Sequence, residues 1–376
     1  MKYYIIAGEA SGDLHGSNLM KALLIKDPNA EIRFWGGDLM EKAGGTLVKH
    51  YRDLAFMGFV EVVQNLRTIL RNISFCKKDI VGFNPDVLIF IDYPGFNLRI
   101  AEWAKKRGIQ THYYISPQIW AWKESRIKAI KRDVDFMYVI LPFEKEFYEV
   151  KHKYPVTFVG HPLIDAIEAY RNEDHGDFRI KHNLDDRPII ALLPGSRKQE
   201  ISRLLTEMLS VIHNYPEYQF VIAGAPGQEA SFYDQFMKDK NISFVLNETY
   251  ALLNVAHAAL VTSGTATLET ALFKVPQVVL YKGNQISYEI AKRIITLRYI
   301  SLVNLIMDDD VVVELIQGDC NSKRIEEEFK KITVGEKRLK ILLDYEKLIC
   351  NLGGRGASKY VADEIIENHK KKISTN

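Results

Sequence analysis

The feature of the sequence that most constrains the fold is a repeated pattern in which a short apolar run precedes a helical period. Residues 87–91 read Val-Leu-Ile-Phe-Ile, and residues 189–193 read Ile-Ile-Ala-Leu-Leu. Runs this short and this continuously apolar are typical of strands buried on both faces of a parallel sheet. Strands that alternate with helices predict an α/β fold whose binding sites lie at the carboxyl ends of the strands.

The pattern occurs twice in succession, which predicts two Rossmann-like domains that face a cleft. The predicted domains span residues 1–170 and 187–345, and the polar stretch 170–187 is interpreted as their linker. A C-terminal helix at about residues 350–370 is expected to pack back on the first domain. The predicted strands cover residues 3–7, 31–35, 87–91, 111–115, 136–140, 157–159, 189–193, 220–223, 243–245, 259–262 and 277–281. After residue 314 the pattern is mainly helical.

Composition narrows the class of protein. The net charge of +2 argues against a nucleic-acid-binding protein that depends on a strong positive field. The three cysteines have no metal-binding spacing, which favours a reduced, cytoplasmic protein. No apolar run approaches the length that spans a bilayer, so we expect a soluble protein that could still contact a membrane surface.

Two turns in the second predicted domain have the chemistry of an anion site. Ser263-Gly264-Thr265 links an apolar strand to a helix, and such a turn offers backbone N–H groups at a positive helix end. Glu269, one turn later, could accept hydrogen bonds from the hydroxyls of a ribose. The turn at residues 194–197 ends in Arg197, whose guanidinium could bind phosphate oxygens in pairs. The alternatives are an ordinary helix cap and a surface arginine.

In the first predicted domain, Asp92 follows a buried strand, where a carboxylate could act as general base toward a hydroxyl. Its alternative role is an Asx turn or a helix cap, and Glu9 and Asp13 are rival carboxylates. Trp120 belongs to an aromatic cluster that packs in the core or lines the cleft. The histidines share no metal spacing, so we expect no metal ion and no cofactor.

Two stretches are unusually apolar for segments that also carry basic residues. Residues 54–63 precede Arg67 and Arg71, and residues 288–304 mix isoleucines with lysine and arginine. Such segments could contact anionic lipid or acyl chains. Burial in the core is the alternative interpretation.

Nine short segments of this chain together form a specific pattern. They are residues 8–13, 57–62, 92–97, 116–122, 141–144, 159–162, 193–197, 263–269 and 301–305. Each segment alone is weak evidence, but all nine occur in the order found in one family. In this the chain resembles the lipid-A-disaccharide synthase family of bacterial glycosyltransferases.

The resemblance implies a GT-B fold and an activity in lipid A biosynthesis in a Gram-negative bacterium. UDP-2,3-diacylglucosamine would react with 2,3-diacylglucosamine 1-phosphate (lipid X), with inversion and without metal. The products would be the β-1,6-linked lipid A disaccharide 1-phosphate and UDP. The protein would be cytoplasmic and peripherally associated with the cytoplasmic face of the inner membrane. A homodimer is one assembly that it could form.

The resemblance implies roles for Asp92, Arg197, Glu269 and Asn304, and the chemistry of the turns and apolar segments adds the other expected site residues. The catalytic residues would be Asp92 and Arg197. The donor site would comprise Gly195, Ser196, Arg197, Ser263, Gly264, Thr265, Glu269 and Asn304. The acceptor or lipid site would comprise Glu9, Ser11, Gly12, Asp13, Met57, Phe59, Val60 and Trp120.

The chain departs from the family pattern at two positions. Gly95 stands where a second aspartate is frequent, which narrows the choice of base toward Asp92, and Val303 stands where a proline often precedes Asn304. Two other functions stay open. One is another UDP-sugar enzyme, such as a peptidoglycan glycosyltransferase or a nucleotide-sugar epimerase, and the other is a non-catalytic sensor of nucleotide sugars.

Overall fold

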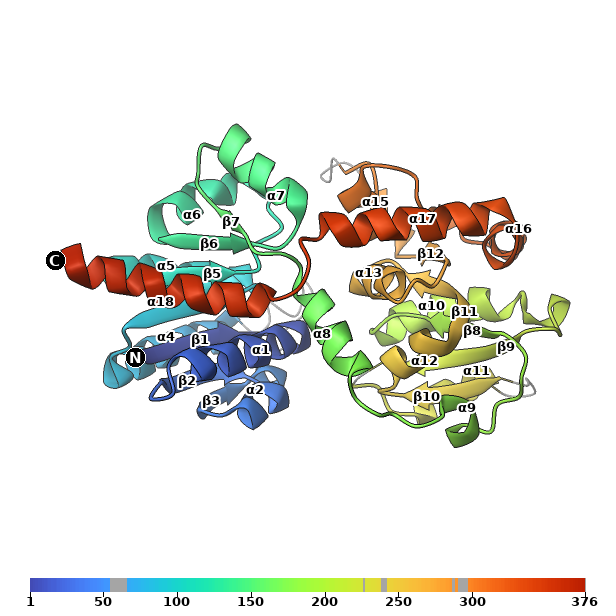
Figure 1. The fold of residues 1–376 in the computed structure, drawn as a ribbon, viewed down its shortest axis with the longest axis horizontal. Coiled ribbons are helices and arrows are strands. Elements are labelled where there is room, and N and C mark those ends of the chain that lie inside the picture. Colours follow the sequence, from blue (N-terminus) through green and yellow to red (C-terminus); the bar gives the residue numbers. More distant parts are fainter. Residues whose placement is uncertain (55–65, 226, 238–241, 286–287, 290–296, 376) are drawn as a thin grey trace. The chain divides into compact units, whose positions relative to one another are not determined.

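The structure is a computed structural model that describes residues 1–54, 66–225, 227–237, 242–285, 288–289 and 297–375 (Figure 1). The chain divides into two compact units. Unit 1 comprises Met1–Asp165 and Leu352–Asn376, and unit 2 comprises Ala166–Asn351. The first boundary falls inside helix α8 (Pro162–Arg171), so the polar stretch interpreted as a linker belongs to unit 2.

A parallel sheet forms the centre of unit 1, with the described strands in the order β3-β2-β1-β4-β5-β6-β7. The strands are β1 (Lys2–Ala7), β2 (Glu31–Gly36), β3 (Thr46–His50), β4 (Val87–Ile91), β5 (Gln110–Tyr114), β6 (Phe136–Val139) and β7 (Thr157–Phe158). The helices are α1 (Ala10–Lys26), α2 (Asp38–Ala43), α4 (Leu66–Phe83), α5 (Pro94–Lys105), α6 (Ile127–Asp133), α7 (Pro142–Glu146) and α18 (Ala357–Thr375), with short turns η1 (Tyr51–Asp53), η2 (Glu124–Arg126) and η3 (Phe147–Lys151).

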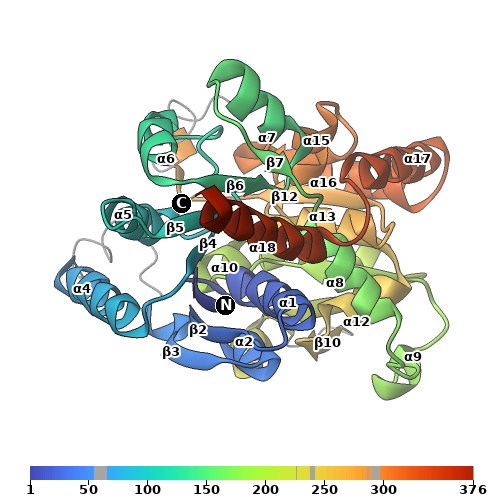
Figure 2. The same ribbon diagram turned by 60° about the vertical axis from the view of Figure 1, so that its left-hand side comes forward.

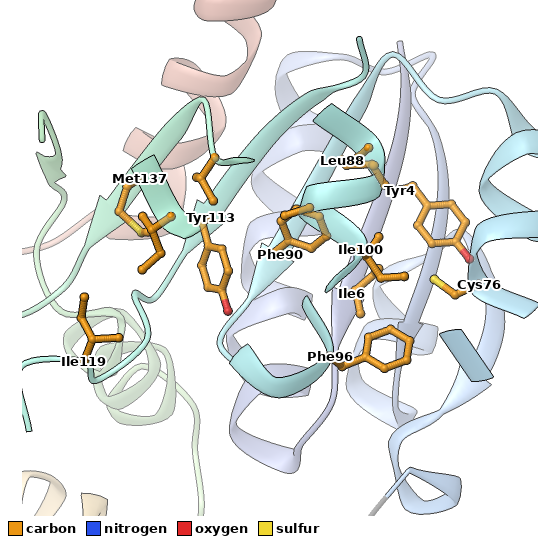
Figure 3. Close-up of a cluster of buried hydrophobic side chains, with 14 of the residues drawn as sticks. Tyr4, Ile6, Cys76, Leu88, Phe90, Phe96, Ile100, Tyr113, Ile119 and Met137 are labelled. Atoms are coloured by element: carbon orange, nitrogen blue, oxygen red, sulfur yellow. The ribbon is translucent and has the colours of Figure 1, made fainter. Parts of the chain in front are cut away.

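Alternate residues of the central strands build the core on one face of this sheet. Tyr4 and Ile6 of β1 lie beside Leu88 and Phe90 of β4 in the parallel register. Figure 3 shows these side chains packed together with Phe96 and Ile100 of α5. Every residue of β4 is buried, which is why its sequence reads as one continuous apolar run.

The C-terminal helix α18 packs along α1 in unit 1, as Figures 1 and 2 both show. Val361 and Ile365 are fully buried on its inner face. At its edge, the Lys26 ammonium lies 2.7 Å from the Asp363 carboxylate. The inner face of α18 is therefore part of the core of the first unit.

A second parallel sheet forms the centre of unit 2, with the described strands in the order β10-β9-β8-β11-β12-β13. The strands are β8 (Ile189–Leu193), β9 (Gln219–Gly224), β10 (Ser243–Leu246), β11 (Ala256–Thr262), β12 (Gln277–Tyr281) and β13 (Val313–Ile316). The helices are α9 (Phe178–Lys181), α10 (Lys198–Leu209), α11 (Ser231–Met237), α12 (Thr249–Val255), α13 (Thr265–Leu272), α15 (Leu302–Met307), α16 (Ser322–Thr333) and α17 (Glu336–Asn351), with short turns η4 (Ile212–Asn214) and η5 (Gln317–Asp319).

Two strands, β3 and β13, were not predicted from the sequence. Both lie at a sheet edge, and most of their side chains are only half-buried. Edge strands need no continuous apolar run, so they lack the signal by which the central strands are found. Within the described residues, no helix is long and apolar enough to cross a membrane.

Candidate active site

In unit 1, two of the predicted carboxylates belong to residues that follow the ends of neighbouring strands. The strand order reverses between β1 and β4, where Ala7 pairs with Ile91. Glu9 follows the first of these strand ends and Asp92 follows the second. In open α/β sheets, the crevice at such a reversal is the usual place for a ligand.

The backbone that carries Asp92 is held in an unusual conformation. Asp92 and Tyr93 both have positive φ angles, of 44° and 50°. The Tyr113 hydroxyl donates to the Asp92 carbonyl oxygen at 2.6 Å, and the Asn97 side chain donates to the same oxygen at 2.7 Å. Left-handed conformations of non-glycine residues cost energy and persist where the surroundings fix them, often at functional sites. Within the described residues, the start of α5 has no side-chain cap, so Asp92 does not cap that helix.

The surroundings of Asp92 favour the protonated, neutral form of its carboxyl group. Burial is the main cause that raises its pKa to about 7, and the negative charges of Glu9 and then Glu144 act in the same direction. A hydrogen bond from the backbone of Tyr93 opposes them in part. A general base works best when its pKa lies near the working pH, so this carboxyl group suits that role.

Glu144 is a site carboxylate that the sequence reasoning missed. It is almost completely buried and accepts from the Ser116 hydroxyl at 2.6 Å and from the backbone N–H groups of Ile140 and Leu141 at 3.1 and 2.9 Å. Burial nevertheless raises its pKa. The available signal was Pro142 followed by Glu144, which are preferred residues at the first and third positions of a helix.

Trp120 is held at this site through Glu144. The indole N–H donates to the Glu144 carboxylate at 3.1 Å, and the ring meets Phe143 edge-on with centroids 4.9 Å apart. Its side chain is only half-buried. Trp120 is therefore fixed next to the candidate carboxylates instead of filling the centre of the core.

Asp13 and Gly12, which are predicted to bind the acceptor, both take part in the packing around α1. The Asp13 carboxylate accepts from the backbone N–H groups of Gly37, Leu39 and Met40 at 2.7 to 3.0 Å and thereby caps α2. A carboxylate so engaged is no rival base to Asp92. At Gly12 a β-carbon would lie 3.1 Å from that of Ala7, so glycine permits close packing of α1 on β1.

The remaining predicted acceptor residues lie near the start of α1 or outside the described residues. Glu9 is half-buried and immediately precedes α1, and Ser11 is exposed in its first turn. Met57, Phe59 and Val60 lie in the segment 55–65, which is outside the described residues.

In unit 2 the two predicted phosphate turns also follow the ends of neighbouring strands. The strand order reverses between β8 and β11, where Leu193 pairs with Val261. The turn at Gly195 follows β8, and the turn at Gly264 follows β11. The structure thus brings the two turns to one edge of the sheet, at the reversal where a ligand is expected.

The first turn leads into α10 through Arg197. Gly195 has a φ of 106°, and a β-carbon there would lie 2.3 Å from a carboxylate oxygen of Glu200. That oxygen accepts from the backbone N–H of Ser196 at 3.1 Å. The Ser196 N–H is therefore engaged within the turn, while the Arg197 side chain is exposed to solvent at the start of the helix.

The second turn presents the start of α13. Gly264 has φ 150° and ψ −164°, a combination that is essentially restricted to glycine. Within the described residues no side chain caps this helix, and Thr265 at its first position is exposed. Ser263 is hydrogen-bonded within the protein, since its N–H donates to the Leu280 carbonyl at 3.0 Å and its hydroxyl donates to the Ile300 carbonyl at 2.8 Å. An anion here would meet the N–H groups of Gly264 and Thr265, whereas Ser263 holds the turn in place.

Glu269 lies one turn into α13 and lines a cavity of about 1100 Å³ within unit 2. Tyr250, which the sequence reasoning missed, donates its hydroxyl to Glu269 at 3.0 Å. Burial raises the pKa of the Glu269 carboxyl. Segments 170–181 and 247–255 supply the other lining residues, among them Tyr170, His175 and Glu248.

Asn304, which is predicted to contact the donor, is buried, and both ends of its amide are hydrogen-bonded within unit 2. Its Nδ2 donates to the Val312 carbonyl at 2.8 Å and to the Glu314 carboxylate at 3.0 Å. Its Oδ1 accepts from the Val312 N–H at 3.0 Å. The turn around Asn304 forms without a preceding proline because the Ser301 hydroxyl caps α15. Among the residues described, no group of three or more histidine, cysteine or acidic side chains could hold a metal ion.

Comparison with known proteins adds the family. The family model described as lipid-A-disaccharide synthetase matches residues 3–366. The lipid-A-disaccharide synthase of Syntrophus aciditrophicus is 41% identical over 368 residues, and 95% of each chain is covered. The enzyme of the same name from Coxiella burnetii is 41% identical over 331 residues, and 86% of each chain is covered.

Solved structures share the fold at low sequence identity. A UDP-GlcNAc 2-epimerase from Neisseria meningitidis, bound to UDP-GlcNAc, is similar with a TM-score of 0.67 at 14% identity, over 98% of this chain and 100% of its own. The glycotransferase of kitacinnamycin has a TM-score of 0.68 at 12% identity, over 98% of each chain. These similarities concern the fold alone, and they confirm the predicted GT-B fold class.

Proposed function

The chain belongs to the lipid-A-disaccharide synthetase family and is a glycosyltransferase of lipid A biosynthesis, and we propose that it joins two acylated glucosamine units. The donor would be UDP-2,3-diacylglucosamine and the acceptor 2,3-diacylglucosamine 1-phosphate (lipid X). The products would be the β-1,6-linked disaccharide 1-phosphate and UDP. Asp92 carries this proposal, because a carboxyl group with a pKa of about 7 at a strand reversal suits proton abstraction from a hydroxyl.

In the proposed reaction, unit 1 binds the acceptor and Asp92 removes the proton from its 6-hydroxyl. The oxygen attacks the anomeric carbon of the donor on the face opposite to the UDP, so the configuration at that carbon inverts. Glu9 and the Glu144–Trp120 pair lie around the base. Glu9 contributes to its raised pKa, and Trp120 offers an aromatic surface to a sugar ring.

Unit 2 is proposed to bind the UDP group of the donor. The Arg197 guanidinium and the N–H groups of Gly264 and Thr265 would stabilise the charge that develops on the departing diphosphate, without a metal ion or cofactor. Loss of one such donor typically lowers kcat about 10²–10³-fold. Glu269 would accept from the ribose hydroxyls, and the cavity beside it supports this role because it leaves room for a nucleoside.

Both substrates carry acyl chains, so we propose peripheral association with the cytoplasmic face of the inner membrane. Helix α4 supports this, since Leu70 and Phe75 are 54% and 45% exposed beside the exposed Arg67 and Arg71. If the protein stays in solution when it is sedimented with anionic liposomes, and reversing both arginine charges changes nothing, this part of the proposal fails. No nucleic acid is expected as a partner.

The test is an assay with the two synthetic diacyl substrates. UDP release is expected only when the acylated acceptor is present, and both Asp92→Asn and Arg197→Ala should reduce the rate by at least about 100-fold. Conversion of the UDP-sugar without acceptor would instead indicate an epimerase. Binding without turnover, unchanged in Asp92→Asn, would indicate a sensor.

A further inference from the structure

We infer that Glu314 is a positioning residue for the phosphate-binding start of α13. It lies on the edge strand β13 and acts through the turn at residues 300–301. The inference rests on the proposed function, because it assumes that the N–H groups of Gly264 and Thr265 receive the diphosphate.

Glu314 holds the turn at residues 300–301 with both oxygens of its carboxylate. One oxygen accepts from the Ile300 N–H at 2.9 Å, and the other accepts from the Ser301 N–H at 2.9 Å. The second oxygen also accepts from the Asn304 side chain at 3.0 Å. Hydrogen bonds to a carboxylate are stronger than those between neutral groups, and two in parallel also fix orientation.

The turn at residues 300–301 also holds Ser263 in place. The Ile300 carbonyl accepts a hydrogen bond from the Ser263 hydroxyl at 2.8 Å. Since the Ile300 N–H donates to Glu314, Ile300 alone links the Glu314 carboxylate to the phosphate turn. On its other side, Ser263 donates its N–H to the Leu280 carbonyl of β12. Ser263 is therefore fixed through both donors immediately before Gly264, the residue that begins the anion site.

Glycine makes this support necessary. Apart from its chain neighbours, no described residue has an atom within 4 Å of where a β-carbon of Gly264 would stand, so no packing against such a residue fixes this part of the turn. Glycine also has the widest choice of backbone conformations, so its φ of 150° must be set by its neighbours. The hydrogen bonds on Ser263 provide that constraint on the preceding side.

Loss of the Glu314 charge should move the phosphate turn. With glutamine at position 314, the N–H of either Ile300 or Ser301 would face the NH₂ group of the side chain and lose its acceptor. Water does not reach Ser301 in this turn, because the residue is fully buried. A buried donor without a partner is costly, so the turn would shift to find water. The Ile300 carbonyl would shift with it and release the Ser263 hydroxyl.

The experiment measures UDP affinity by calorimetry on the full chain, for Glu314→Gln, Ser263→Ala and the double variant. Each single variant should weaken UDP binding about tenfold, while the KM for the acceptor stays within about twofold. The double variant should be no weaker than the worse single variant, because both changes break the same link. The control is Asp310→Asn, which removes an exposed acid from the same loop and should leave UDP affinity unchanged.

The outcomes separate positioning from simple support of the fold. A lower melting temperature for Glu314→Gln with unchanged UDP affinity would overturn the inference, and so would additive losses in the double variant. If Glu314→Gln does not fold, Ser263→Ala alone decides, since unchanged UDP affinity in that variant also overturns it. Wild-type protein that binds no UDP would contradict the proposed function itself, and the inference would fall with it.

Discussion

At the residue scale, Asp92 combines a fixed backbone with a carboxyl group that resists ionisation. Its position after β4 was predictable, because a buried apolar run that ends in a carboxylate is visible in the sequence. The hydroxyl of Tyr113 and the amide of Asn97 that fix it come from β5 and α5 and carry no such signal. Asp13 shows the reverse case, since its role as the cap of α2 depends on a contact between segments that only the fold reveals.

The pKa of Asp92 predicts the pH dependence of the reaction. A base must be ionised, and its pKa is raised to about 7, so kcat/KM should fall about tenfold per pH unit below 7 and level off above it. The Glu9 charge contributes to that raised value. Glu9→Gln should therefore shift the inflection of the kcat/KM profile to lower pH.

The matched control for Glu9→Gln is Glu102→Gln, which removes an exposed carboxylate on α5 of the same unit. Its profile should coincide with that of the wild type. An inflection that Glu9→Gln leaves in place would mean that the Glu9 charge does not contribute to the pKa of Asp92.

The buried histidines of unit 1 predict its sensitivity to acid. Burial lowers the pKa of His15 to about 4 and that of His161 to about 3. Because the unfolded chain takes up protons near pH 6.5 and the folded chain does not, stability is present above that pH and is lost between about 6.5 and 4. His15 alone should contribute about 3 kcal/mol to this loss.

Thermal unfolding followed from pH 7.5 to 4.5 measures this effect. His15→Gln should flatten the decline, whereas His213→Gln, at an exposed position in unit 2, should leave it unchanged. A wild-type melting temperature that is constant over this range would contradict the burial of neutral histidines.

At the element scale, the central strands and the two phosphate turns were predictable, but their supports were not. The turns carry local signals, namely glycines between a buried strand and a helix. Asn304 and Ser263 have the same kind of local signal, yet their polar groups bond to the segments 300–314 and 277–281. Sequence alone cannot separate a polar side chain that binds ligand from one that fastens a loop, because both need the same atoms.

The turn at Gly264 predicts that backbone strain and UDP binding are coupled. Among the described residues beyond its chain neighbours, none lies within 4 Å of a β-carbon at this position, so Gly264→Ala should act through its φ of 150° and not through a clash. We expect a loss of about 1–3 kcal/mol in the free energy of unfolding together with weaker UDP binding, because the N–H groups at the start of α13 would change direction.

Gly335, between α16 and α17, provides the comparison for Gly264→Ala. It has a φ of 85°, and a β-carbon there would likewise have no neighbour within 4 Å in the described part of the chain, apart from the residues next to it in sequence. Gly335→Ala should lose comparable stability while UDP affinity stays unchanged. Equal UDP affinity in both variants would show that the turn at Gly264 does not bind the diphosphate.

At the scale of the whole molecule, the chain forms two units, and the segment Leu352–Asn376 completes unit 1. Leu352 accepts from the N–H of His161, and the Gly356 N–H donates to Asp165 at 2.6 Å, so the returning chain is bonded to the end of the first segment. The local helical pattern of the last segment was visible in the sequence. Which sheet it covers depends on contacts with residues more than 300 positions away, such as Lys26.

This arrangement predicts that a change near the C-terminus weakens unit 1 and spares the nucleotide site proposed for unit 2. Ile365 of α18 is fully buried, so Ile365→Ala should reduce the free energy of unfolding of unit 1 by about 2–4 kcal/mol. UDP affinity should stay within about twofold, because the proposed UDP site belongs to the other unit. Ile373, on the same helix and 64% exposed, gives a control whose change to alanine should cost less than about 0.5 kcal/mol. Hydrogen exchange resolved by segment measures both effects, and faster exchange in β8 and β11 of Ile365→Ala would show that the two units unfold as one.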